Sequence, residues 1–127
     1  MATPQLSPGV LVREVDLTVG RAENVLAPGM GKNMGDGWET RRSRGKNFDW
    51  LILKCATPGK INKIQIDTHH FKGNYPDKCS VQAAYIKNQS SSKSIVNKSK
   101  NWKLLLGKVK LHAHKKHNFN NLSLIHI

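Results

Sequence analysis

Short apolar runs of strand length, each closed by turn-forming residues, dominate the chain from Asp49 onward. DWLILKC (49–55) is an apolar run followed by the turn signal ATPG, and INKIQID (61–67) alternates Ile64 and Ile66 with polar neighbours. A period of two residues is typical of strands with one buried face. Because only a short turn segment separates the two runs, we predict that they form an antiparallel pair.

A third strand is predicted after a polar break. The segment HHFKGNYPDK (69–78) is rich in Gly, Asn, Pro and Asp, which indicates a structured loop. It leads into CSVQAAYI (79–86), where Val81, Ala83 and Tyr85 share one face. This alternation predicts a strand.

The next two segments have opposite characters. Residues 87–101 are rich in Ser, Lys and Asn, too polar to build a core, and they predict a flexible surface loop. Residues 102–117, WKLLLGKVKLHAHKKH, alternate again, which predicts a half-buried strand. One face of that strand carries Val109, Leu111 and Ala113, and the other carries Lys110, His112 and His114.

The fold class follows from these segments together. Helical periodicity is weak throughout, so we predict an all-β fold, an antiparallel β-sandwich or jelly roll. A chain of 127 residues allows one compact domain at most. The predicted strands are too few to close a sandwich, and we therefore expect the domain to be incomplete.

The formal net charge of +13 is the feature that most invites a nucleic-acid partner. The basic residues are scattered, however, and no helix-turn-helix, zinc-finger or RNA-binding strand pattern accompanies them. Only 6% of the residues are aromatic and available for base stacking. Nucleic acid is not expected as a partner.

The cellular location of the protein and the roles of its cysteines are both inferred from motifs that the sequence lacks. No stretch approaches the roughly 20 apolar residues of a membrane helix, and the N-terminus lacks the regions of a signal peptide. We therefore expect a soluble cytoplasmic protein without membrane association. Cys55 and Cys79 show neither CxxC spacing nor a disulfide framework, and we interpret both as small apolar core residues.

Residues 1–26 contain no lysine and differ from the rest of the chain. An alternating run from Val10 to Val19 predicts an edge strand or arm. The string LSPGVLVREVDLT resembles the N-terminus of contractile-phage tail sheath proteins. That resemblance implies a subunit-linking arm, joined as a chimera to an unrelated domain. We therefore expect residues 1–27 to be an arm outside the domain, and residues 28–127 to be the domain.

The segment NMGDGWETRRSRG (33–45) concentrates glycines, acids and arginines around Trp38. Glycine permits backbone conformations closed to other residues, and arginine offers a planar fork that suits a carboxylate. One interpretation is a ligand-binding loop. The other is a surface loop in which Asp36 and Glu39 simply pair with the arginines.

Several motifs in register resemble the allantoicase family. GDGWETRR, DWLILK and PGKINKIQIDTHHFKGNYPDKCSVQAA follow one another in the order and spacing of that family, and the later tryptophan, leucine and histidine string is similar to its next stretch. The resemblance implies a β-sandwich repeat of the galactose-binding-like kind, closest to the C-terminal of two repeats. It also implies a domain truncated after Phe119.

The resemblance implies a hydrolase of purine (allantoin) catabolism that converts allantoate and water to ureidoglycolate and urea. Such a reaction needs a cation for the carboxylate, an acid for the departing urea and a base for water. The catalytic candidates are Glu39, Asp67, His69 and His70. The substrate-binding candidates are Arg41, Arg42, Asp36 and Asn74.

Each candidate also has a purely structural interpretation. Asp67 would cap its strand, His69 and His70 would pack or hydrogen-bond in the loop, and Asn74 would shape the turn. The sequence alone assigns neither the acid nor the base.

His112, His114 and His117 form a separate group, since His-x-His on one strand face can hold a metal. With lysines adjoining and no acidic ligand evident, we interpret them as an exposed basic strand. We expect no metal and no cofactor.

The partners implied by the resemblance are allantoate, a second repeat of the same family, and further copies in a homo-oligomer when full length. We expect this chain to be inactive alone. Two alternatives stay open: a phage tail sheath fragment, and a ligand-binding β-sandwich without catalysis.

Overall fold

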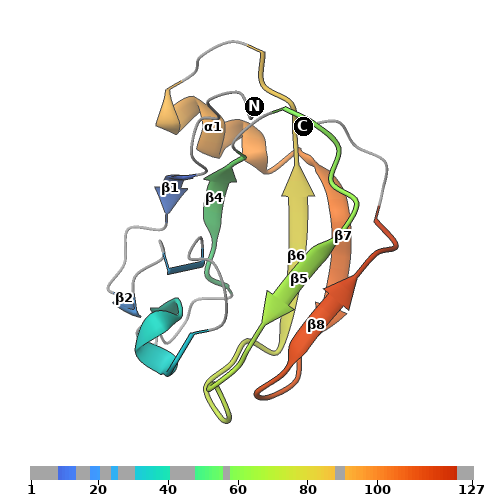
Figure 1. The fold of residues 1–127 in the computed structure, drawn as a ribbon. Coiled ribbons are helices and arrows are strands. Elements are labelled where there is room, and N and C mark those ends of the chain that lie inside the picture. Colours follow the sequence, from blue (N-terminus) through green and yellow to red (C-terminus); the bar gives the residue numbers. More distant parts are fainter. Residues whose placement is uncertain are drawn as a thin grey trace, which may run out of the picture. The chain divides into compact units, whose positions relative to one another are not determined.

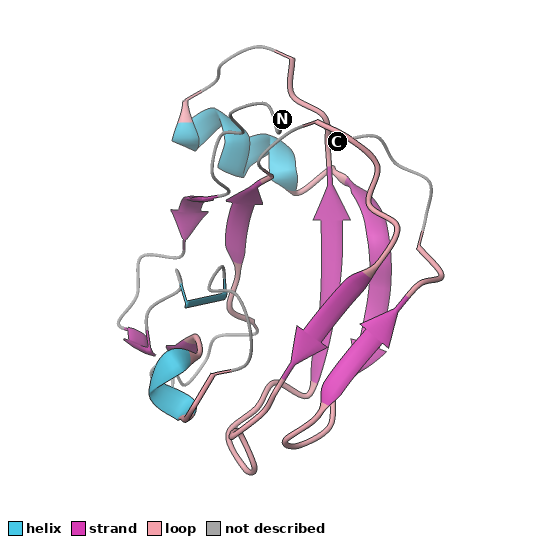
Figure 2. Ribbon diagram, viewed as in Figure 1, coloured by secondary structure: helices cyan, strands magenta, loops and turns pink. Residues whose placement is uncertain are grey.

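The computed structural model describes residues 9–13, 18–20, 24–25, 31–40, 48–55, 58–87 and 91–122 (Figure 1). The chain divides into two compact units, Met1–Thr57 and Pro58–Ile127. Antiparallel strand pairs make up most of the regular structure described, in agreement with the predicted all-β class (Figure 2). No helix in these described ranges has the length and apolar character needed to span a membrane.

The first unit contains two antiparallel strand pairs. β1 (Gly9–Arg13) pairs with β4 (Leu51–Lys54), and β2 (Thr18–Gly20) pairs with β3 (Glu39–Thr40). Both pairs contain a register shift, which is typical of short, irregular edges. Ile52 of β4 is 8% exposed and supplies a buried side chain.

The predicted antiparallel pair of runs 49–55 and 61–67 is wrong. Both runs do form strands, β4 and β5 (Ile64–Asp67), but β4 pairs with β1 and β5 pairs with a strand near the end of the chain. Local alternation fixes which face a strand buries. It does not fix which distant strand fills its hydrogen-bonding edge.

The loop that carries the GDGWE motif is closed by its own hydrogen bonds. Asn33 caps η2 (Met34–Asp36) by accepting a backbone N–H of that helix at 2.8 Å. The carboxylate of Asp36 accepts the N–H of Lys32 at 2.8 Å. Gly31 permits this close approach, since a Cβ there would lie 2.9 Å from the Cβ of Asp36. The loop therefore has a defined local shape.

Two antiparallel ladders build the second unit. β5 pairs with β8 (Lys116–Phe119), and β6 (Lys78–Ala83) pairs with β7 (Lys103–Lys110). In Figure 1 the β5–β8 ladder lies in front of the β6–β7 ladder, the arrangement expected for a sandwich. Residues 68–77 connect the two ladders, so the loop that we predicted over residues 69–78 is present except that Lys78 already belongs to β6.

A bulged strand supplies the core of the second unit. Leu105 and Leu106 are neighbours in sequence, yet they are 1% and 7% exposed. The β6–β7 register shifts on both sides of Val81, because β7 contributes extra residues there. Such bulges turn consecutive side chains toward the buried face. The other buried apolar side chains described in this unit are Ala83, Ile95 and Leu111.

The predicted flexible loop over residues 87–101 contains a helix, α1 (Ser92–Ser99), and that prediction is wrong. The hydroxyl of Ser91 caps the helix by accepting the N–H of Ser94 at 3.2 Å. Ile95 is 8% exposed and anchors the otherwise polar helix. A cap and one buried side chain were enough to order a segment whose composition indicated a loop.

Two predicted strand boundaries are also wrong. β6 ends at Ala83, and Tyr85 is 49% exposed instead of sharing a buried face. β7 ends at Lys110, and Ala113 and His114 lie in a turn. The chain passes here from β7 to β8, so the alternating residues beyond Lys110 lie in the connection between these two strands and not in a strand.

The interpretation of both cysteines as small apolar core residues is wrong. Cys55 is exposed, because it lies directly after the end of β4. Cys79 is half-buried, and burial raises the pKa of its thiol.

Candidate active site

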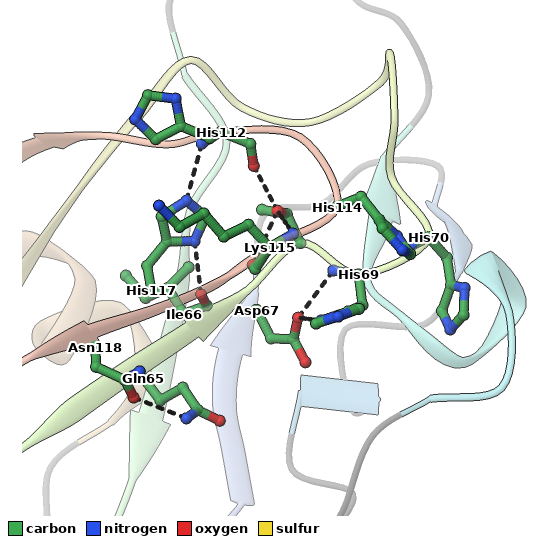
Figure 3. A network of polar contacts seen from close by, with 11 residues as sticks. Gln65, Ile66, Asp67, His69, His70, His112, His114, Lys115, His117 and Asn118 are labelled. Carbon is green, nitrogen blue, oxygen red and sulfur yellow. Dashed lines mark hydrogen bonds and ion pairs between the residues drawn. The ribbon is translucent and has the colours of Figure 1, made fainter.

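Two turns meet at one end of the second unit (Figure 3). Residues 68–71 follow β5, and residues 112–115 precede β8. In the β5–β8 register Asp67 faces Lys116, so the residues just beyond the two strand ends become neighbours. We refer to residues 68–71 and 112–115 together as the double turn.

Thr68 joins the two turns through its backbone and its hydroxyl. Its N–H donates to the carbonyl of Lys115 at 2.9 Å. Its hydroxyl donates to the carbonyl of His112 at 2.6 Å and accepts the N–H of Lys115 at 3.1 Å. Thr68 is only 4% exposed, so these bonds are shielded from water. The hydroxyl takes the place of the backbone bond that commonly closes a four-residue turn.

His70 and His114 link the turns a second time. The N–H of His70 donates to Nδ1 of His114 at 2.8 Å, and the N–H of His114 donates to the carbonyl of Phe71 at 3.0 Å. Both backbones are left-handed, with φ of 73° at His70 and 48° at His114. Residues other than glycine adopt such values at a cost of about 1–2 kcal/mol each. The double turn therefore stores strain that its hydrogen bonds hold in place.

Asp67, the last residue of β5, orients the ring of His69. Its Oδ1 accepts the backbone N–H of His69 at 2.8 Å and lies 2.5 Å from Nδ1 of the ring. An ionised carboxylate only accepts, so Nδ1 carries a proton and Nε2 of the neutral ring carries the lone pair. A histidine oriented in this way can take up a proton at Nε2 and return it.

The carboxyl group of Asp67 is tuned toward its ionised form. Partial burial raises the pKa of Asp67, but the backbone and ring hydrogen bonds from His69 lower it, as do the charges of His69 and Lys116. The net pKa lies below the usual 3.8. Asp67 is therefore an acceptor for His69 throughout the neutral pH range.

Three imidazole rings gather beside Asp67. The ring centroids of His69 and His114 are 4.8 Å apart, those of His70 and His114 are 5.7 Å apart, and those of His69 and His70 are 6.2 Å apart. Loss of hydration lowers the pKa of His114 below its usual 6.5, and the charges of His69, Lys72 and His70 add to this against the opposite effect of Asp67. His114 is therefore neutral at neutral pH.

Both ring nitrogens of His117 form hydrogen bonds with the backbone. Its Nδ1 lies 2.9 Å from the carbonyl oxygen of Ile66, and its Nε2 accepts the N–H of His112 at 2.9 Å. A carbonyl only accepts and an N–H only donates, so the ring is neutral with its proton on Nδ1. Because His117 is 7% exposed, the predicted exposed basic strand is wrong for this residue.

Comparisons with known proteins show the family to which the chain belongs. A family model described as the allantoicase repeat matches residues 4–126. The chain belongs to the allantoicase repeat family. It is 52% identical over 111 residues to probable allantoicase 1 of Burkholderia mallei, covering 87% of this chain and 33% of that protein. A probable allantoicase of Stutzerimonas stutzeri is 50% identical over 100 residues, covering 79% of this chain and 30% of that protein.

The fold is also that of the allantoicase family. The crystal structure of allantoicase from Saccharomyces cerevisiae superposes with a TM-score of 0.76 at 31% identity, over 97% of this chain and 36% of that chain. The predicted β-sandwich is confirmed. The chain spans about a third of the length of the curated relatives it matches.

The tail-sheath resemblance of the N-terminal segment is not supported. The allantoicase repeat match starts at residue 4 and so includes most of the residues that suggested a sheath arm. Within that segment β1 pairs with β4, a strand of the allantoicase-like motif DWLILK. The division of the chain at residue 27 stays a prediction.

The structure brings only some of the predicted allantoicase site residues together. Asp67, His69 and His70, three of the four catalytic candidates, are neighbours in the structure. Asn74 lies in the exposed loop between β5 and β6 of the same unit. The first unit carries the half-buried Glu39 at the start of β3 and Asp36 in the motif loop, where its carboxylate binds a backbone N–H. The predicted residues Arg41 and Arg42 lie outside the described residues.

Two residues of the site were not predicted as such. His114 was assigned to an exposed strand, and Thr68 was not singled out. The bonds that join these residues to the opposite turn span 43 to 47 residues, a separation that no local pattern reveals. Within the described ranges, no group of three His, Cys, Asp or Glu side chains has the geometry to hold a metal ion.

Proposed function

We propose that the chain is one repeat of an enzyme that hydrolyses allantoate to ureidoglycolate and urea in allantoin catabolism. Family membership and the names of the curated relatives support this. The observation that carries the proposal is the Asp67–His69 pair, an ionised carboxylate 2.5 Å from an imidazole whose other nitrogen bears the lone pair.

In this proposal His69 moves the proton. Nε2 removes a proton from water while the water oxygen bonds to the carbon bearing the two ureido groups and the C–N bond to one of them breaks, and the protonated ring then gives this proton to the nitrogen of the departing urea. Asp67 stabilises the imidazolium that exists between these events. His70 contributes a second imidazole beside the reacting groups.

The remaining candidates have supporting roles in the proposal. Arg41 and Arg42 bind the substrate carboxylate through their planar forks. Glu39 shares in the proton transfers, and Asp36 and Asn74 bind the ureido groups. Asp36 can do so through its second carboxylate oxygen, because Oδ2 is the atom that binds the N–H of Lys32.

The working enzyme in this proposal needs more than this chain. Because the chain spans about a third of its curated relatives, we propose that a second repeat of the same family completes the site, and that the full-length protein forms a homo-oligomer. The chain alone is then inactive.

A hybrid enzyme tests the function. Residues 4–126 would replace the matching stretch of the Burkholderia mallei relative, and urea release from allantoate would be measured. We expect the hybrid to release urea, and His69→Asn to lower kcat by about 10²–10⁴-fold, because asparagine can bind Asp67 but has no group in place of Nε2. Circular dichroism would establish that the variant is folded.

Three results would contradict the proposal. Urea release by the purified 127-residue chain, free of full-length enzyme, would show that no second repeat is needed. A His69→Asn hybrid with full activity would remove His69 from the mechanism, and a folded hybrid that binds allantoate without turnover would favour a ligand-binding sandwich.

A further inference from the structure

His70 has a backbone that its side chain disfavours. It occupies the third position of the turn closed by the bond from Phe71 N–H to the Thr68 carbonyl at 2.9 Å, and its φ is 73°. Turns with this value at the third position usually place glycine or asparagine there. A histidine at this position needs an outside contact to hold it.

That contact is Nδ1 of His114. The N–H of His70 donates to it at 2.8 Å across a separation of 44 residues. A backbone N–H cannot accept, so Nδ1 of His114 must be unprotonated, and the proton of the neutral ring is on Nε2. This hydrogen bond therefore fixes the backbone of one turn and the tautomer of a side chain on the other.

The link is reciprocal. His114 is itself left-handed, with φ of 48°, and its N–H donates to the carbonyl of Phe71 at 3.0 Å. Each strained residue thus uses its N–H to bond the opposite turn. Displacement of one residue removes the support of the other, so the two left-handed positions form one cooperative element.

We propose that His114 is a positioning residue of the active site, which holds His70 in its left-handed conformation and so sets the distance between the His70 ring and the Asp67–His69 pair. The role in catalysis rests on the function proposed above. The structural part, that the acceptor at Nδ1 holds the turn, stands independently of any reaction.

Substitutions at His114 test whether the turn needs the hydrogen-bond acceptor at Nδ1 or only the volume of the side chain. Asparagine places Oδ1 where the ring has Nδ1 and tolerates positive φ, whereas glutamine places its polar group near the position of Nε2. In the full 127-residue chain, hydrogen exchange at the His70 amide would be followed by NMR. We expect exchange about tenfold faster in His114→Ala and His114→Gln, and near the original rate in His114→Asn.

A glycine at position 70 provides a control for strain. His70→Gly adopts the left-handed backbone without cost, so replacement of His114 by alanine should destabilise the chain less in the His70→Gly background than in the original one. This comparison also covers the case in which His114→Ala alone does not fold.

The outcomes separate the two proposals. Unchanged His70 exchange in His114→Ala, or equal loss in the asparagine and glutamine variants, would overturn the positioning role. In the hybrid enzyme we expect His114→Ala to lower kcat about tenfold and His114→Asn to restore it. If the hybrid releases no urea while the 127-residue chain shows the expected exchange pattern, the proposed function is refuted and the structural assignment is left intact.

Discussion

His114 and His117 are three residues apart, and each accepts a backbone N–H at a ring nitrogen, yet their surroundings differ. His117 is 7% exposed, and both of its ring nitrogens bond the backbone. His114 is exposed, and one nitrogen bonds the backbone of a strained turn. The buried histidine therefore holds the fold together, whereas the exposed one shapes a small surface. The cost of losing each should differ accordingly.

The largest effect is expected at His117. His117→Ala would remove the ring that bonds the carbonyl of Ile66 and the N–H of His112, and it would open a cavity at a buried position. We expect the free energy of unfolding to fall by about 3 kcal/mol or more, measured by urea denaturation. His112→Ala is the matched control, because it removes an exposed ring that stacks on His117 and keeps the backbone donor. If both variants lose the same free energy of unfolding, the proposed difference between buried and exposed histidines is wrong.

A smaller loss is expected at Thr68, which lies at the boundary between the two environments. Thr68→Val keeps the shape of the side chain and removes the hydroxyl that bridges His112 and Lys115. We expect a loss of about 1–3 kcal/mol, because the part-buried N–H of Lys115 and carbonyl of His112 lose the hydroxyl as a partner. Thr68→Ser should lose less, since it retains the hydroxyl. If Thr68→Ser lowers the free energy of unfolding as much as Thr68→Val, then packing of the Thr68 methyl group, and not the hydrogen bonds of its hydroxyl, holds the two turns together.

The smallest effect is expected on the exposed side, at Asp67. The folded pKa of Asp67 is lowered, so its contribution to stability is present above the usual 3.8 and disappears as the pH falls through the folded value. Asp67→Asn should therefore cost less than about 1 kcal/mol at pH 7, since both partners are partly exposed. The difference should vanish in strong acid. Both proteins would be titrated with acid and followed by circular dichroism. A difference in stability that persists in strong acid would show that the contribution of Asp67 does not depend on its ionisation.

The sequence predicted the strands better than their partners. The alternation around Ile64, Ile66 and Val81 marked β5 and β6 correctly, because side-chain burial in a strand repeats every two residues. Partner choice depends on the whole chain, so the predicted pairing of 49–55 with 61–67 failed. α1 was missed because its order depends on a serine cap and the burial of Ile95, both weak signals in a polar segment.

The site was predicted in the same uneven way. Asp67, His69 and His70 lie within four consecutive residues, so a motif could collect them. His114 and Thr68 could not be assigned, since their roles arise from the register of β5 against β8. Alternation of apolar residues with lysine and histidine over residues 109–114 predicted a strand, and only the turn that follows β7 makes one of those histidines a partner of His70.

The double turn also has a consequence for the order of folding. The hydrogen bonds between its two turns join residues 43 to 47 positions apart, so they form only after that stretch of chain has closed into a loop. Non-local contacts of this kind slow folding, although doubling the closed stretch would cost only about 0.6 kcal/mol in entropy. The candidate active site should therefore appear late, after both ladders have paired, and a nascent or partly unfolded chain should lack it even where Asp67 and His69 are already in contact.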